Sequence, residues 1–595
     1  MRGNKFTGPQ SRRAQARTYY VAPITRAVRT ALAASAIALA GVGAVHAGGT
    51  DCGGMVQAQL IRCAEVDAAK LPVADLTTVA DAHAPDSVVA AGTTGITAPG
   101  VAAFTVNIVN SGPIDKSDGG DVVGIEADFA GADVSIVNTA NGSIYVESVD
   151  GLADGIFANG DEVTVNNRGT IQADGYDWAA GIEAQGDSVT VNNNGNISAS
   201  ASAYDTAYGV YGHAYGIYVA GSGDDGTVVN NRGSIEASGP YATGIYAYDG
   251  GSGGINVTNR GDITATADGG FATGINAVTS VEGSDITVAN RGSIEATGMN
   301  GATGIVALAT GVGSSASVNN TGDIYAATTA YYSAAEGIVV SADGDADIRN
   351  SGSITIGYGD YAYGALALAF AGDANVRNTG DIAAYGGLSA YGAVAASQNG
   401  YADATNAGSI TVSSGLGTAA GLDVSGQAGA SATNSGYINA YGSSNAFGVR
   451  ANSAVGDAEV DNRGDIIATS GKYAFGVFAQ SGDSDVMVEN SGTIATDGKY
   501  SFGVLAQSTY GDVLVENSGA IAGSGKYAYG VVAGSNGGDV EINNADGGKL
   551  SGYSGDMIAV GAFANANLDG SATIDNAGVT SATAVGYAQL AYGAV

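Results

Sequence analysis

The chain of 595 residues carries a formal net charge of −35, and 45% of its residues are hydrophobic while only 13% are charged. Glycine contributes 96 residues and proline only 7, which excludes collagen, and the hydrophobic share is too large for a disordered chain. Two cysteines are too few for a disulfide scaffold or a cysteine zinc site. We therefore expect an extended β-repeat structure and not a compact enzyme.

Residues 1–47 are expected to be a secretory signal peptide. The first 50 residues contain seven Lys or Arg residues and no Asp or Glu, and the apolar stretch 31–44 is followed by a Val-His-Ala motif that ends at Ala47. An amphipathic targeting helix is the alternative. Removal of residues 1–47 takes away these seven basic residues and leaves 15 Lys or Arg against 57 Asp or Glu residues, a net charge of −42. Such a surface repels nucleic acid, which we exclude as a partner.

Residues 48–103 precede the repeats and are rich in Ala, Asp and Thr. We expect this segment to cap, or lead into, the first coil, whose first strand begins near Phe104. Cys52 and Cys63 lie within the segment and are candidates for a disulfide in an oxidising compartment. A reactive cysteine pair is the alternative.

An internal repeat organises residues 104–595. An Asn-x-Gly motif recurs throughout, and its glycines are 28 residues apart five times in succession between Gly352 and Gly492. Two further copies, at Asn141-Gly142 and between Asn544 and Gly548, carry small insertions. Stacked in register, each Asn amide can bond to the corner backbone and to the next Asn, which predicts an asparagine ladder. The motif glycine is expected to take a positive φ.

A second motif, a small residue followed by an aromatic residue or Thr and then Gly-Ile or Gly-Val, keeps step with the first, as in residues 528–531. Each unit therefore contains three short strands with period-2 alternation. Such strands can bury a core only by pairing in parallel with their copies one coil away. This predicts an all-β fold, a right-handed parallel β-helix (solenoid) of about 17 coils with ~28-residue repeats. The inward side chains of one coil are expected to be Val513, Val515, Ile521, Val531 and Ala533.

The unit formed by residues 511–521 and 529–533 resembles the passenger repeats of Gram-negative type V autotransporters. The resemblance covers residues 104–595, and the long basic signal agrees with it. It implies export through the general secretory route, translocation by an outer-membrane β-barrel, display at the cell surface, and adhesion. Since the chain ends within a repeat at Val595, we expect the barrel either downstream in a longer product, of which this chain is a fragment, or in a partner chain.

No enzymatic activity, cofactor or metal is expected. Outside the signal only His83 and His213 remain, so a Ser-His-Asp triad lacks its base. Arg-Gly-Asp at Arg260 and Arg463 falls on the repeat turn, which favours turn chemistry over integrin binding. Two alternatives to adhesion stay open, namely a β-helical polysaccharide-degrading enzyme and a structural spacer for a missing domain. The acids of the Gly-Asp corners are expected to be solvated turn residues, with weak calcium binding as the alternative; they are Asp161, Asp187, Asp373, Asp457, Asp483, Asp512 and Asp539.

The best candidate for an interaction surface is a set of lysines and tyrosines on three consecutive coils. Stacking places them in adjacent columns with a spacing of about 5 Å, which could hold a glycan, or a host or neighbouring cell surface, by stacking and hydrogen bonding. The alternative is that the aromatic rings cover a corner of the solenoid and the lysines keep it soluble. These residues are Lys472, Tyr473, Lys499, Tyr500, Lys526 and Tyr527.

Overall fold

The computed structural model describes residues 87–89, 96–99 and 105–594, apart from residues 130, 206–209, 569 and 586–589. The chain divides into two compact units, residues 1–56 and 57–595, and all described residues belong to the second. The predicted signal peptide, Cys52 and Cys63 lie outside the described residues. Within the described part no helix forms, and so none is long and apolar enough to cross a membrane.

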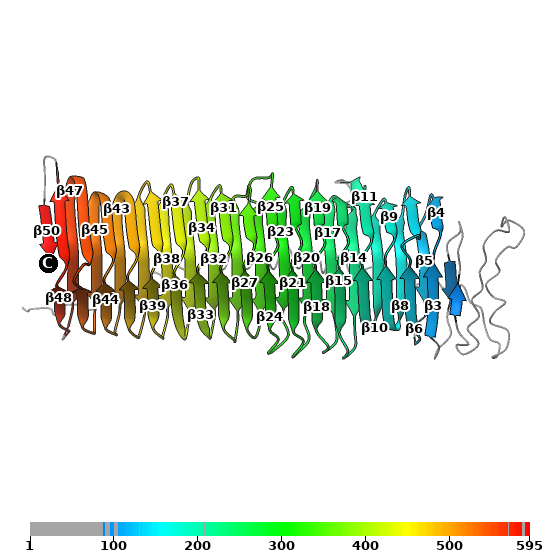
Figure 1. Ribbon diagram of the computed structural model, residues 1–595, viewed down its shortest axis with the longest axis horizontal. Helices are drawn as coiled ribbons and strands as arrows, with labels where there is room; N and C mark the ends of the chain where they lie inside the picture. The colour runs from blue at the N-terminus through cyan, green and yellow to red at the C-terminus, as the bar shows by residue number, and fades with distance from the viewer. Residues whose placement is uncertain are drawn as a thin grey trace, which may run out of the picture. The chain divides into compact units, whose positions relative to one another are not determined.

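The second unit is a parallel β-solenoid of about 17 turns with ~28-residue spacing, and 72% of the structure is strand. Each coil contributes three strands, as in β30 (Ala374–Asn378), β31 (Asp381–Gly386) and β32 (Ser389–Ser397). Figure 1 shows the coils stacked side by side in chain order. In the later coils the second and third strands run together, as in β45 (Ala520–Ser535).

Within the 48-stranded sheet of the solenoid, parallel pairing joins each strand to its copy one coil away. The three strands named above pair with β33 (Tyr401–Asn406), β34 (Ser409–Ser414) and β35 (Thr418–Gly426). Within the segment 48–103, β1 (Ser87–Val89) and β2 (Ile96–Pro99) pair in the same way with β3 (Thr105–Asn110) and β5 (Val122–Asp128). The longest interval between coils contains the antiparallel pair β12 (Tyr204–Asp205) and β13 (Val210–Tyr211).

The core runs through the inside of the coils and consists of Ile, Val, Leu and Ala side chains from all three strands. Identical positions meet one coil apart, so that Ile382 of β31 lies beside Ile410 of β34. The five predicted inward side chains of one coil are confirmed, because each is at most 1% exposed. Their burial is what holds the coils together, since no single coil can enclose a core.

The predicted asparagine ladder is confirmed and is unbroken through the described coils. The side-chain amide of each Asn donates to the amide oxygen of the next across 2.7–2.9 Å. Most members also donate to the carbonyl of the following motif glycine, as Asn378 does to Gly380 at 2.9 Å. In the second coil the ladder residue is Asn138, so the insertion predicted at Asn141-Gly142 lies between Asn138 and Gly142.

The prediction of a positive φ at the motif glycine is wrong, because none of the described Asn-x-Gly glycines takes one. Glycine is required instead by the close approach of successive coils. A Cβ on Gly408 would lie 1.9 Å from the carbonyl oxygen of Gly380 in the preceding coil. The glycine of the second motif is constrained similarly, since a Cβ on Gly392 would lie 2.3 Å from Cγ2 of Ile410.

Candidate functional site

The third strand of each coil carries two outward-facing side chains next to its motif glycine, one directly before it and one two residues after it. In β14 (His213–Gly221) these are Tyr215 and Tyr218, on either side of Gly216. Neither belongs to the core, yet they are only 7% and 8% exposed, because their rings pack edge to face at 5.4 Å. We call the series of such side chains along the solenoid the bend row.

Aromatic rings fill several stretches of the bend row. Tyr218 stacks on Tyr246 of the next coil at 5.1 Å, and Tyr363 stacks on Tyr391 at 5.1 Å. Burial raises the pKa of Tyr246 to about 12, so these phenols stay neutral at physiological pH. A continuous stack runs through the later coils, and its members are Phe447, Phe475, Phe502 and Tyr529.

Charged groups occupy other positions of the bend row. Arg450 donates from Nε to Asp423 at 2.6 Å and also from Nη2, and both side chains are buried. Glu336 is 4% exposed, and burial raises its pKa to about 7. Asp154 is buried as well, and burial, followed by the charge of Glu183, raises its pKa well above the usual range. The sequence analysis did not identify these groups, because the alternation of a strand shows that a side chain points outward and not that a neighbour covers it.

The predicted lysine and tyrosine columns are brought together on β41 (Tyr473–Ser481), β43 (Thr493–Ser508) and β45. Tyr473 stacks on Tyr500 at 5.0 Å, and Tyr500 stacks on Tyr527 at 4.8 Å. The ammonium groups of Lys472 and Lys499 lie 4.9 and 5.4 Å from the ring centroids of the tyrosines that follow them. The ring faces therefore contact one another, and a ligand would meet the ring edges and the lysines.

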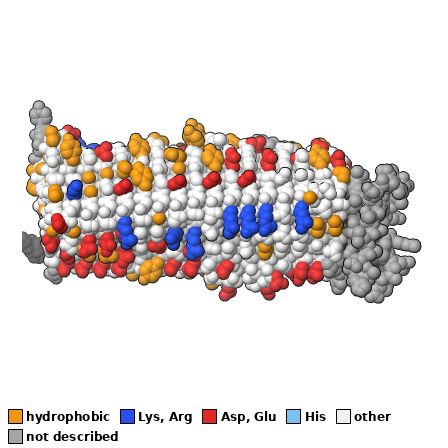
Figure 2. Space-filling model, in the orientation of Figure 1, with side chains coloured by type: hydrophobic (Ala, Val, Ile, Leu, Met, Phe, Trp, Pro, Cys, Tyr) orange, Lys and Arg blue, Asp and Glu red, His pale blue; other side chains and the backbone are white. Residues whose placement is uncertain are grey.

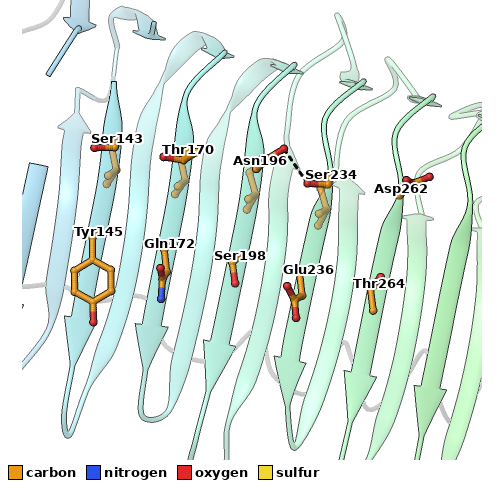
Figure 3. Close-up of a pocket in the computed structure, with 14 residues that line it drawn as sticks. Ser143, Tyr145, Thr170, Gln172, Asn196, Ser198, Ser234, Glu236, Asp262 and Thr264 are labelled. Carbon is orange, nitrogen blue, oxygen red and sulfur yellow. Dashed lines mark hydrogen bonds between the residues drawn. The ribbon is translucent and has the colours of Figure 1, made fainter. Parts of the chain in front are cut away.

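A shallow groove of about 450 Å³ lies elsewhere, over the second strand of five successive coils; we call it the polar groove after the mostly polar side chains that point outward along it. Its strands are β7 (Ser143–Ser148), β9 (Thr170–Gly175), β11 (Asn196–Ala201), β16 (Ile235–Gly239) and β19 (Ile263–Ala267). Figure 3 shows two columns of outward side chains along it, one beginning at Ser143 and the other at Tyr145. Between coils, the Ser234 hydroxyl donates to Oδ1 of Asn196 at 2.9 Å.

The groove was not predicted, although its polar outward positions can be read from the alternation of the second strand. Hydroxyl, amide and carboxylate groups recur there in five coils in succession, which is the signal that could have identified it. The outward side chains that line it are Ser143, Tyr145, Thr170, Gln172, Asn196, Ser198, Ser234, Glu236, Asp262 and Thr264, and the isoleucines between them, Ile144, Ile171, Ile197 and Ile235, complete the lining. Such an array of donors and acceptors can bind a ligand rich in hydroxyl groups along the solenoid axis.

The acids of the Gly-Asp corners have a structural role. The backbone N–H of Asp512 donates to the carboxylate of Asp485 one coil earlier, and that of Asp539 donates to Asp512, both at 2.8 Å. The corner residue of that coil is therefore Asp485, although the sequence pattern had indicated Asp483. Among the described residues, no group of three His, Cys, Asp or Glu side chains could hold a metal ion.

The described surface thus offers three distinct features for binding, namely the bend row, the lysine and tyrosine columns, and the polar groove. The first is largely closed by its own packing, whereas the other two expose polar groups in columns one coil apart. Comparison with known proteins adds no assignment, because no family model, no curated protein and no solved structure matches this chain.

Proposed function

We propose that the protein is an exported passenger of the autotransporter type, displayed at the cell surface, that attaches the cell to surfaces or to other cells without catalysing a reaction. Its partner for translocation would be an outer-membrane β-barrel, encoded either downstream or in a separate chain. The parallel β-solenoid and the basic N-terminal leader support this proposal.

One observation carries the proposal: each outward position recurs as a column of side chains spaced by one coil. The polar groove extends over five coils, and the lysine and tyrosine columns over three. A repetitive polymer can contact such a column at several coils at once. Many weak contacts then add up to strong attachment, because each further contact is intramolecular.

A polysaccharide-degrading enzyme is the second candidate, and the carboxyl groups of Asp154 and Glu183 favour it. Burial raises the pKa of both, and glycoside hydrolysis uses a pair of carboxyl groups of which one is protonated. Asp154 is only 4% exposed, however, which leaves little access for a sugar chain. Binding without cleavage therefore fits the surface better.

The test uses the full chain, fluorescently labelled, on bacterial cells, on host cells and on immobilised neutral and acidic polysaccharides. We expect saturable binding to at least one of these surfaces, with no release of reducing ends from the polysaccharides. Absence of binding to every surface would overturn the proposal. Release of reducing ends that is abolished in Asp154→Asn would establish the enzyme in its place.

A further inference from the structure

Four arginines form a row along one side of the solenoid, at the middle position of the Asn-x-Gly turn. Of five successive coils, four carry an arginine at this position and one carries Asn194. All four arginines are exposed. Figure 2 shows basic side chains lined up along the coils, with acidic ones mostly toward the margins of the view. We call Arg168, Arg232, Arg260 and Arg291 the arginine row.

None of these four guanidinium groups pairs with a carboxylate among the described residues. Arg463 occupies the same turn position further along and does pair, with Asp461 two residues earlier, at 2.6 Å. In the arginine row the residue two positions earlier is neutral in every coil, namely Asn166, Asn230, Thr258 and Ala289. In a chain with a net charge of −35, four unneutralised cations in register are a local reversal of the overall charge.

The arginine row borders the polar groove. Two residues after each turn position, the chain enters the second strand, and Thr170, Asn196, Ser234 and Asp262 there all line the groove. Row and groove therefore share four coils. Arg291 lies one coil beyond the groove, and Ser143 and Tyr145 lie one coil before the arginine row. The groove also contains the carboxylates of Glu236 and Asp262, and the latter accepts the backbone N–H of Ser293 at 3.3 Å.

We propose that the arginine row and the polar groove together bind a linear acidic polysaccharide, carrying carboxylate or sulfate groups, that lies along the solenoid axis. The proposal rests on the attachment function above and names its ligand class. Guanidinium groups bind carboxylate and sulfate oxygens through paired hydrogen bonds. The hydroxyl and amide groups of the groove bind the sugar hydroxyls.

The geometry favours a sugar polymer over other polyanions. Arg232, Arg260 and Arg291 are spaced by one coil, ~4.8 Å, which is close to the length of one sugar unit in an extended chain. A nucleic acid carries a denser charge that extends well beyond four arginines, and the surrounding acidic surface would repel it. The groove also offers a single aromatic ring, that of Tyr145, and hence no series of rings on which bases could stack.

The test measures binding of polygalacturonate and of heparin to the full chain by titration calorimetry, with dextran as the neutral polymer. The variant carries Arg232→Ser, Arg260→Ser and Arg291→Ser. Serine occupies this turn position naturally at Ser351, Ser435 and Ser491, so the variant should fold, as thermal unfolding would verify. We expect its affinity for the acidic polymer to fall about tenfold or more, because three charge-assisted contacts are lost.

The matched control carries Arg349→Ser, Arg377→Ser and Arg463→Ser, which change the net charge equally on later coils, and it should bind as the parent does. Polygalacturonate and heparin distinguish a carboxylated ligand from a sulfated one. Four outcomes would each overturn the proposal. They are an equal loss of affinity in both triple variants, binding of dextran as tight as that of the acidic polymers, tighter binding of single-stranded DNA than of the acidic polymers, and no binding of either acidic polymer. Cell attachment that persists in the Arg232, Arg260 and Arg291 variant would leave the attachment function standing without this ligand.

Discussion

Thr303 donates its hydroxyl group to one carboxylate oxygen of Glu336 across 3.1 Å, and the second carboxylate oxygen has no hydrogen-bond partner. The two residues occupy equivalent positions of adjacent coils, on β23 (Gly301–Ala309) and β26 (Ala334–Ala342). An ionised carboxylate with an unpaired, buried oxygen is costly, so burial raises the pKa of Glu336 to about 7. The bend row thus contains a carboxyl group that titrates near neutral pH.

This group should make the solenoid less stable as the pH rises. The pKa in the folded chain exceeds the ordinary value of 4.5, so the folded state binds more protons between pH 4.5 and about 7. The stabilisation is present below pH 4.5 and is lost as the pH rises to about 7. Glu336→Gln should therefore raise the free energy of unfolding at pH 8 by roughly 1–3 kcal/mol.

Denaturant unfolding of Glu336→Gln at pH 5 and pH 8 measures this effect. Glu295→Gln, at an exposed position, is the control and should leave the free energy of unfolding unchanged at both pH values. If the free energy of unfolding changes as much between pH 5 and pH 8 in Glu336→Gln as in the parent, Glu336 is not the group that titrates near neutral pH.

Asn406 lies in the middle of the asparagine ladder, where its amide receives a hydrogen bond from Asn378 and donates one to Asn434. Asn406→Ala leaves a buried donor and a buried acceptor unpaired, which should cost roughly 2–4 kcal/mol. Hydrogen exchange should speed up in the coils on both sides of residue 406 and little elsewhere. Asn399→Ala, at an exposed position, is the control; equal exchange in the two variants would argue against a stabilising ladder.

Gly392→Ala should destabilise the solenoid, because the new Cβ would lie 2.3 Å from Cγ2 of Ile410 and 2.6 Å from the carbonyl oxygen of Gly421. Relief of such contacts requires the coils to move apart, at a cost of roughly 1–3 kcal/mol. Thermal unfolding measures the loss. Gly555→Ala should have no such effect, since nothing lies within 4 Å of its Cβ position, and a wild-type melting temperature for Gly392→Ala would refute the close approach.

Tyr500 is stacked between Tyr473 and Tyr527. Tyr500→Ala removes two ring contacts and should lower the free energy of unfolding by roughly 1–3 kcal/mol. The matched control is Tyr385→Ala, whose side chain is 45% exposed. If the columns serve only to bind a ligand, the two variants will unfold at the same denaturant concentration.

Export should remove residues 1–47, so the mature chain should begin at Gly48 with a net charge of −42. Mass spectrometry of the chain recovered from the periplasm or the medium of a Gram-negative host checks this cleavage. An intact N-terminus on exported protein would point to the targeting-helix alternative. Under non-reducing conditions the same mass shows whether Cys52 and Cys63 are bonded, because a disulfide lowers it by two hydrogens.

Much of the fold could be predicted from the sequence because a solenoid brings each residue beside its own copies. Asn378 meets Asn406, and Ile382 meets Ile410, at the separation that the repeat itself displays. Period, strand number, core positions and the ladder then follow from local pattern alone. Two column positions were predicted wrongly. An insertion after Asn138 moves the predicted Asn141-Gly142 out of the ladder, whereas Gly482-Asp483 imitates the Gly-Asp pattern two residues before the true corner residue, Asp485.

The candidate site could be predicted only in part. The lysine and tyrosine columns follow from the repeat, whereas the stacking that closes the ring faces depends on the distance between coils. The groove and the unpaired arginines depend on which outward side chains meet at a corner.

The sequence by itself therefore determined the parallel β-solenoid, its coil repeat and its core, because these depend on spacings along the chain. Only the tertiary structure decided that Glu336 and Asp154 are buried, since outward positions become enclosed where two side chains pack together at the bend. The tertiary structure also explains why glycine is required at the motif positions. The reason is the contact between successive coils, a distance that no single repeat contains.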